Sequence, residues 1–239
     1  MNLANTQYEL IDILDITHSG HRNVVDITVE GDETFTLSNG IISHNSAVSG
    51  MASVRDPEIH GGLGLKGKVM NVNGASPKEV LNDGALRDIM NSIGITPTGK
   101  WDRASMRYGK VFIAADADPD GMNITALLVN FFHTFWPEMF EDKDNPIINV
   151  FMTPFIIAEK GKQRKYWYAN NYEEFKPEDY KGWTITRAKG LGTLTKEDWA
   201  ASLANPVTYP VTQDGKMADS LSLIFDKGRS DDRKSWIGL

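Results

Sequence analysis

The first 45 residues contain short apolar runs separated by polar turns. Four of these runs are rich in β-branched residues and partly alternate with polar ones, a pattern typical of β-strands. Ser38-Asn39-Gly40 joins the last two runs with tight-hairpin chemistry, because Asn and Gly tolerate positive φ. Strands this short and few cannot enclose a core, so we expect this segment to need a partner that supplies more strands. The four runs cover residues 8–16, 23–30, 33–37 and 41–43.

From residue 46 onward the pattern alternates between strand-like runs and helical stripes. Ser76-Pro77-Lys78-Glu79 predicts a helix start with a capping box and Pro at the first position, and Gly94 ends the stripe that follows. Strands are expected within residues 147–159, interrupted at Pro154, and at 184–188, before a helix that Thr195 caps. This succession predicts a doubly wound α/β domain. A second stripe is formed by Ile124, Leu127, Leu128, Phe131, Phe132 and Phe135.

Three ring side chains are interpreted as structural residues and not as ligands or base-stacking groups. His133 lies off the stripe, and we interpret it as a surface or second-layer residue and not as a ligand. Most aromatic residues, Trp136 and Tyr168 included, are expected in the core or at an interface and not as base-stacking groups.

Charge is distributed unevenly along the 239 residues, whose formal net charge is -7. Residues 1–45 hold one basic and seven acidic residues, whereas the remainder holds 24 basic and 25 acidic ones. The remainder therefore permits a basic patch without demonstrating one. The chain has no cysteine, which excludes disulfides and thiolate zinc sites. Without a secretory signal or an apolar stretch of about 18 residues, a soluble cytoplasmic protein with no membrane contact is expected.

The strongest chemical motif is VFIAADADPDG, residues 111–121, which we interpret as a buried strand ending in three aspartates. Residues i and i+2 of an extended segment point the same way, so the carboxylates of Asp116, Asp118 and Asp120 are expected to converge. At the carboxyl end of a strand they would lie where α/β sheets bind ligands. A divalent cation with hard oxygen ligands would relieve their mutual repulsion, and Mg²⁺ fits best.

Two rival interpretations of these motifs fail. A calcium-binding EF-hand loop would need a Glu at its twelfth position, where Leu127 stands, and a helix in front of the loop. Residues 62–69, GLGLKGKV, match G-x-x-x-x-G-K but end in Val69, so the magnesium-binding hydroxyl of a phosphate-binding loop is missing. We therefore expect no ATP site in this chain.

Five motifs occur in order over residues 46–239: Ser46-Ala47, LKGKVMNV at 65–72, the aspartates with Gly121, Lys189-Gly190-Leu191-Gly192, and Asp232-Arg233-Lys234 with Trp236. By these motifs residues 46–239 resemble the Toprim region of type IIA DNA topoisomerases, most of all the small subunit of the T-even-type bacteriophage enzyme plus the end of its large subunit. In that family Ser46-Ala47 would be the end of Glu-Gly-Asp-Ser-Ala. One position departs from the pattern, since Met122-Asn123 replaces the usual Ser-His.

This resemblance implies a subunit of an ATP-dependent enzyme that cuts and rejoins double-stranded DNA. Asp116 and Asp118, with a glutamate from elsewhere, would hold Mg²⁺ beside the scissile phosphate, and Lys68, Asn71 and Lys189 would contact the DNA. ATP would bind to the partner subunit that carries the ATPase domain, and the catalytic tyrosine would lie on a third, DNA-cleavage subunit. A phage-encoded protein in the cytoplasm of a bacterial host is the origin that this resemblance implies.

Residues 25–29 and 39–46 resemble the last two motifs of a protein-splicing element, an intein. In that family the amide of Asn45 attacks its own carbonyl, His44 assists as a proton donor, and Ser46 accepts the upstream chain as an ester. Asp26 would orient these groups. Glu33 stands where many relatives have a histidine, which leaves the proton relay open. Because the first half of an intein does not precede these motifs, we interpret the segment as the C-terminal half of a split intein, trans-spliced to the ATPase-bearing subunit.

The expected layout is a small all-β partial intein at 1–45, a Toprim metal-binding core at 46–160 with a mainly parallel, Rossmann-like sheet, and a C-terminal portion with a subunit-contact tail at 161–239. Other functions remain open at this stage. The first segment could be a plain β-rich extension, and the rest another Toprim enzyme such as a primase or nuclease, or a metal-binding regulatory module.

Overall fold

The computed structural model describes residues 34–36, 42–44, 50–65, 67–188 and 190–238. By its internal contacts the chain divides into two compact units, Met1–His44 and Asn45–Leu239. In the first unit, β1 (Thr34–Thr36) pairs antiparallel with β2 (Ile42–His44), with Phe35 opposite Ser43. The strands predicted at 33–37 and 41–43 are thus present. The turn between them and the strands predicted at 8–16 and 23–30 lie outside the described residues.

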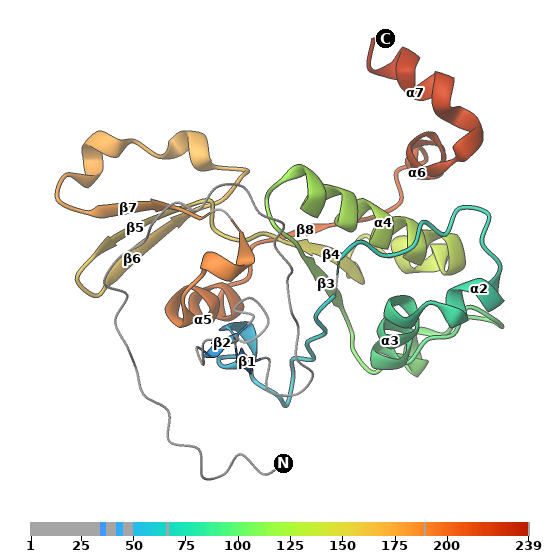
Figure 1. Ribbon diagram of the computed structural model, residues 1–239, viewed down its shortest axis with the longest axis horizontal. Coiled ribbons are helices and arrows are strands. Elements are labelled where there is room, and N and C mark those ends of the chain that lie inside the picture. Colours follow the sequence, from blue (N-terminus) through green and yellow to red (C-terminus); the bar gives the residue numbers. More distant parts are fainter. Residues whose placement is uncertain (1–33, 37–41, 45–49, 66, 189, 239) are drawn as a thin grey trace. The chain divides into compact units, whose positions relative to one another are not determined.

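The described residues of the larger unit form two three-stranded sheets (Figure 1). In the first, β3 (Val111–Ala114) runs parallel to β4 (Ile148–Phe151), and β8 (Thr208–Pro210) runs antiparallel along the other side of β4. The second sheet is fully antiparallel, with β5 (Ile156–Lys160) between β6 (Gln163–Trp167) and β7 (Thr184–Arg187).

The prediction of a mainly parallel sheet is therefore wrong for the described strands, although the α/β class is confirmed. Among them only β3 and β4 are parallel neighbours. The physical reason is the length of the connection between successive strands. The seventeen-residue helix α4 (Pro119–Phe135) leaves room for a parallel crossover, whereas two residues between β5 and β6 permit only an antiparallel hairpin.

Helices α3 (Gly84–Ile93) and α4 form the main core together with β3 and β4. The stripe predicted for α4 is confirmed, because Leu127, Leu128, Phe131 and Phe132 are all buried. The end of α3 is confirmed too, since Gly94 takes a left-handed conformation with φ 84°. The core also draws on α2 (Pro77–Asn82), α6 (Met217–Phe225) and the 3-10 turn η2 (Pro137–Phe140). The 3-10 turn η1 (Arg103–Ser105), which precedes β3, has no buried residue.

A smaller core lies between the second sheet and α5 (Lys196–Ala204). There Trp199 stacks on Phe151, and both rings are buried. Thr195 caps α5 as predicted. Three short elements follow β6 in the chain: η3 (Tyr172–Glu174), η4 (Pro177–Tyr180) and η5 (Leu191–Thr193). Near the end of the chain, η6 (Lys227–Arg229) and α7 (Ser230–Trp236) contact α6.

Strand β3 differs from its prediction in one respect. Only Ile113 is buried in it, and Phe112 is 46% exposed. The cause is its position, because among the described strands β3 lies at the edge of its sheet. Among the described helices, none combines the length and apolar character that a membrane crossing requires.

The positions expected for His133, Trp136 and Tyr168 agree with the structure. His133 is half-buried against the Phe140 ring, with Nε2 3.3 Å from Oε1 of Gln213. Trp136 is 2% exposed and donates from Nε1 to the carbonyl of Thr96. Tyr168 is half-buried, and burial raises the pKa of its phenol.

Candidate metal centre

Asp116 lies two residues beyond the end of β3, where a loop from a distant part of the chain reaches it. Its Oδ1 accepts a hydrogen bond of 2.8 Å from the backbone N–H of Leu191. Gly190 comes so close that a Cβ atom on it would lie 2.8 Å from Oδ2 of Asp116. The backbone of Gly190 is extended, with φ 179°, so space and not φ is what requires glycine here. The carboxylate of Asp116 is thus held from one side by the 190–191 backbone.

Asp118 is the N-cap of α4. Its side-chain Oδ1 accepts a 2.7 Å hydrogen bond from the N–H of Gly121, and its own backbone is extended. The N-terminus of a helix favours negative charge, because its first N–H groups are unpaired. The carboxylate of Asp118 therefore has a fixed direction before any ligand arrives.

Gly121 allows the first turn of α4 to cross the backbone of Asp116. A Cβ atom at position 121 would fall 2.0 Å from the carbonyl oxygen of Asp116, well inside van der Waals contact. This close crossing returns the chain directly from β3 into α4, so that Asp116 and Asp118 lie at the same end of the strand.

Asp120 has a different environment from the other two aspartates. It lies in the first turn of α4, and its Oδ1 is 2.7 Å from Nζ of Lys68. The expectation that all three carboxylates share one extended segment is therefore wrong for Asp120, because the helix begins at Pro119. Both side chains of the pair are well exposed, so the ion pair contributes at most about 1 kcal/mol to stability.

The oxygen atoms available at this site suit a hard divalent cation. Backbone donors occupy Oδ1 of Asp116 and Oδ1 of Asp118, and their Oδ2 atoms have no hydrogen-bond partner among the described residues. Mg²⁺ commonly binds through one or two carboxylates and keeps several waters. Among the described residues, no three His, Asp or Glu side chains form a metal-binding group.

Comparisons with known proteins identify the family. Residues 41–153 match the family model described as "Toprim domain", and residues 151–239 match "C-terminal associated domain of TOPRIM". The chain is 33% identical over 215 residues to DNA topoisomerase 2 of Plasmodium falciparum, a match that covers 85% of this chain and 15% of that protein. Residues 41–239 are therefore a Toprim region of the type IIA topoisomerase kind.

Two further relatives agree with this assignment. DNA topoisomerase 2-alpha of Homo sapiens is 32% identical over 237 residues, which cover 93% of this chain and 15% of the relative. The crystal structure of the Plasmodium falciparum topoisomerase II DNA-binding, cleavage and re-ligation domain superposes with a TM-score of 0.62 at 32% identity, covering 72% of this chain and 24% of that one. This Toprim region thus spans about 15% of the curated relatives.

Two of the three residues expected to contact DNA lie among the described residues, and their environments differ. Lys68 pairs with Asp120, which places its ammonium group beside the aspartates. Asn71 donates from Nδ2 to the carbonyl of Phe225 at 3.0 Å and accepts from the N–H of Asn73, so it ties residues 71–73 to the end of α6. Lys189 lies outside the described residues. Their contact with DNA stays a prediction.

The residues expected to carry out splicing fall mostly outside the described part. His44 is the last residue of β2, whereas Asp26, Asn45 and Ser46 are not among the described residues. The departure from the family pattern is visible, since Met122 and Asn123 both lie exposed on the first turns of α4.

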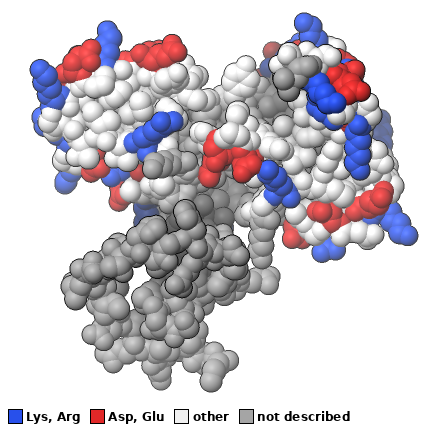
Figure 2. Space-filling model, turned by 45° about the horizontal axis from the view of Figure 1, so that its top comes forward, with Lys and Arg blue, Asp and Glu red and all other residues white. Residues whose placement is uncertain are grey.

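Basic and acidic side chains are interspersed on the face shown in Figure 2. Lys and Arg do not gather there into one large patch, which agrees with the balanced charge of residues 46–239. Attraction of a phosphate backbone to this region would therefore depend on particular lysines and arginines and not on a strong overall field.

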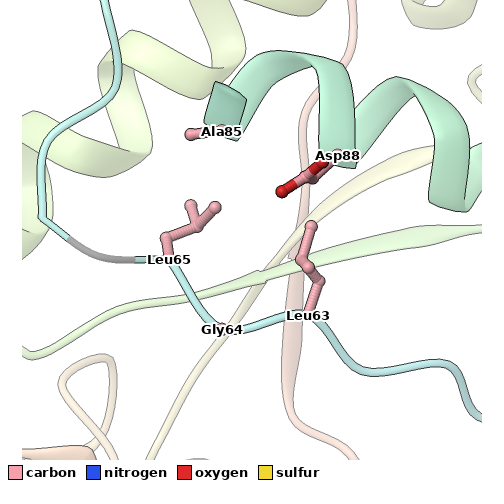
Figure 3. Close-up of a pocket in the computed structure, with 5 residues that line it drawn as sticks. All are labelled: Leu63, Gly64, Leu65, Ala85 and Asp88. Carbon is pink, nitrogen blue, oxygen red and sulfur yellow. The ribbon is translucent and has the colours of Figure 1, made fainter. Parts of the chain in front are cut away.

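A pocket of about 210 Å³ lies on the segment with the G-x-x-x-x-G-K spacing (Figure 3). Leu63 and Leu65 point toward α3, which contributes Ala85 and the carboxylate of Asp88. A carboxylate at the rim repels phosphate groups. Helix α2 begins only at Pro77, so this segment does not open a helix as phosphate-binding loops do.

The sequence analysis did not predict the network of ion pairs next to the end of the 190–194 loop. Arg164 of β6 forms ion pairs with Asp198 of α5 and with Glu159 of β5. The capping box of α5 could be predicted from the sequence, because Thr195 and Asp198 have the required spacing. No local pattern indicates that Arg164 is the partner of Asp198.

Proposed function

We propose that this chain supplies the magnesium-binding aspartates of a type II topoisomerase that breaks and rejoins both strands of DNA. The observation that carries the proposal is the arrangement at the end of β3. Asp116 and Asp118 each keep an oxygen for a cation while backbone N–H groups hold the other, in a region that belongs to the topoisomerase family. DNA and Mg²⁺ are thus the proposed substrate and cofactor.

Each residue of the site has a proposed role. Mg²⁺, when bound, would stabilise negative charge on the scissile phosphate and on the leaving 3′ oxygen. Asp116 and Asp118 would hold it, and Asp120 would keep Lys68 nearby. Lys68, Asn71 and Lys189 would contact phosphates, which position the duplex and carry little sequence information.

The remaining parts of the reaction are proposed to lie on other subunits. A glutamate that completes the metal site and the ATPase domain would belong to one partner, and the catalytic tyrosine to another. This assignment rests on the sequence, in which Ser46-Ala47 begins in the middle of the Glu-Gly-Asp-Ser-Ala motif. A phage-encoded enzyme, working in the bacterial cytoplasm, is the origin that we propose with it.

We further propose that residues 1–45 are the C-terminal half of a split intein, removed when Ser46 is joined to the ATPase-bearing subunit. The boundary between compact units at His44 and Asn45 supports it, as does the hairpin of β1 and β2. The Toprim match begins at residue 41, so a plain N-terminal extension is the alternative. Intact-mass analysis after co-expression with the partner separates the two. Loss of residues 1–45 with gain of the partner's mass supports splicing, and an unchanged chain contradicts it.

The topoisomerase proposal is tested by Asp116→Asn in the reconstituted enzyme. Mg²⁺-dependent relaxation of supercoiled plasmid should be lost, because the amide removes the anionic ligand while keeping the shape. Asp214→Asn is the matched control, since Asp214 also accepts one backbone N–H, from Lys216, far from the site. Full activity of Asp116→Asn would refute the proposal. A product cut in one strand only would favour the nuclease alternative.

A further inference from the structure

A largely buried ion pair anchors the loop that touches Asp116. Asp198 is 2% exposed, and its Oδ1 accepts from Nη1 of Arg164 at 2.5 Å. The other end of the same guanidinium donates to Oε2 of Glu159 at 2.9 Å. A planar guanidinium can engage two carboxylates at once in a fixed geometry, so Arg164 joins α5 to two strands of the second sheet.

The same carboxylate fixes the start of α5. Oδ2 of Asp198 accepts from the backbone N–H of Thr195 at 3.0 Å and from its hydroxyl at 2.8 Å. Nη1 of Arg164 also donates to the Thr195 hydroxyl, at 2.9 Å. Thr195 is therefore held in place by a buried charge on its own helix and by a cation from β6.

A short, hydrogen-bonded turn connects Thr195 to the metal centre. The carbonyl of Gly190 accepts from the N–H of Thr193 at 3.1 Å and from its hydroxyl at 2.7 Å. Leu194, buried in the smaller core, donates to the carbonyl of Leu191. With both ends of this turn defined, the N–H of Leu191 reaches Oδ1 of Asp116 across a separation of 75 residues.

We propose that Arg164 is a positioning residue for the metal centre. By holding Asp198 and Thr195, it fixes the turn at 190–194 against Asp116, and so sets the direction in which Oδ2 of Asp116 faces a cation. Arg164 of the C-terminal associated domain thereby orients a ligand of the Toprim domain through the turn at 190–194 and not through a contact of its own with Asp116. This inference rests on the proposed role of Asp116 in binding Mg²⁺.

The test uses the full chain and compares Arg164→Gln with Arg103→Gln. Arg103 is the matched control, because it also forms a 2.7 Å ion pair, with Asp142, and donates to a carbonyl, that of Asn145. Two readouts are measured by NMR. One is hydrogen exchange of the Leu191 amide without metal, and the other is paramagnetic broadening of amides near Asp116 on titration with Mn²⁺.

In Arg164→Gln, exchange at Leu191 should accelerate at least about tenfold, because its hydrogen bond to Asp116 opens more often. The Mn²⁺ concentration at half-broadening should rise about tenfold, as for other residues that orient metal ligands. Arg103→Gln should change neither value. Arg164→Lys should recover part of both effects, because an ammonium can pair with Asp198 without the second arm to Glu159.

Two outcomes overturn the inference: Arg164→Gln with wild-type exchange at Leu191, or Arg103→Gln with the same effect as Arg164→Gln. Failure of the proposed function gives a different result. If Asp116→Asn leaves the Mn²⁺ titration unchanged, Asp116 is no metal ligand. Exchange at Leu191, measured without metal, still decides whether Arg164 positions the loop.

Discussion

Single residues around Asp116 act mainly by leaving space. Gly121 and Gly190 both lie where a Cβ atom would collide with Asp116, but the obstacles differ. At Gly121 the obstacle is the backbone of Asp116, whereas at Gly190 it is the end of its side chain. A side chain can rotate away more easily than a backbone can move. The two glycines should therefore respond differently to the same substitution.

Gly190→Ala should preserve the fold and damage the metal site. The added methyl group forces the carboxylate of Asp116 to rotate or the loop to withdraw, so the Mg²⁺ concentration for half-maximal relaxation should rise about tenfold or more. Gly109→Ala is the control, because a Cβ there meets nothing within 4 Å and φ is not positive. An unchanged Mg²⁺ requirement in Gly190→Ala would show that the close contact does not constrain Asp116.

Gly121→Ala should instead lower the free energy of unfolding. Because its Cβ would fall 2.0 Å from a backbone oxygen, α4 must shift away from β3, at a cost of about 1–3 kcal/mol or more. Urea unfolding of Gly121→Ala and Gly190→Ala measures the difference. Equal stability of the two variants would contradict this explanation.

At the scale of the elements, the capping boxes of α2 and α5 show that the same local motif can have two different structural roles. At α2, Ser76 and Glu79 cap each other in full solvent exposure. At α5, the same arrangement joins an exposed Thr195 to a buried Asp198, and Asp198 is paired with Arg164. The box at α2 stabilises only its own helix, whereas the box at α5, through the ion pair of Asp198 with Arg164, also fixes a helix relative to a sheet.

Glu79 makes the stability of α2 dependent on pH. Hydrogen bonds from the Ser76 side chain and then from its backbone N–H lower the pKa of Glu79 below 4.5. Its contribution to folding is therefore present above the unfolded pKa and is lost as pH falls through the lower, folded value. Glu79→Gln keeps the capping geometry without the charge. The stability difference between the two proteins should shrink on acidification below about pH 4.5 in urea titrations, and a constant difference would contradict the assignment.

For the whole molecule, the proposed splice joins two halves of one metal site. Asp116 and Asp118 lie in this chain, and the proposed glutamate ligand would arrive with the segment joined to Ser46. The charge distribution agrees with a removable first segment, since residues 1–45 carry seven acidic residues and one basic residue.

An unspliced chain should therefore be inactive in DNA cleavage. Asn45→Ala combined with Ser46→Ala should keep its full mass after mixing with the partner and should not support Mg²⁺-dependent relaxation. Asn91→Ala, at an exposed helical position, should splice and relax DNA like the wild type. Full topoisomerase activity of the double variant would disprove the proposal that splicing assembles the site.

Local chemistry was sufficient to predict several features of this protein. The starts of α2 and α5, the end of α3 at Gly94 and the buried stripe of α4 all follow from side chains within a few residues. A cap or a stripe depends on neighbours in sequence, so it can be read without the fold. The motifs and the family resemblance could be recognised for the same reason, because each motif consists of residues close together in the sequence.

Contacts between distant residues were decided only by the tertiary structure. The antiparallel position of β8, the bond from Leu191 to Asp116 and the ion pair of Lys68 with Asp120 all join segments far apart in the chain. No local preference specifies such partners, because they depend on how sheets and helices pack. The sequence by itself determined the caps of α2 and α5, the buried stripe of α4 and the place of Asp116 and Asp118 just after β3. The tertiary structure decided which backbone group holds Asp116, since that group lies 75 residues away.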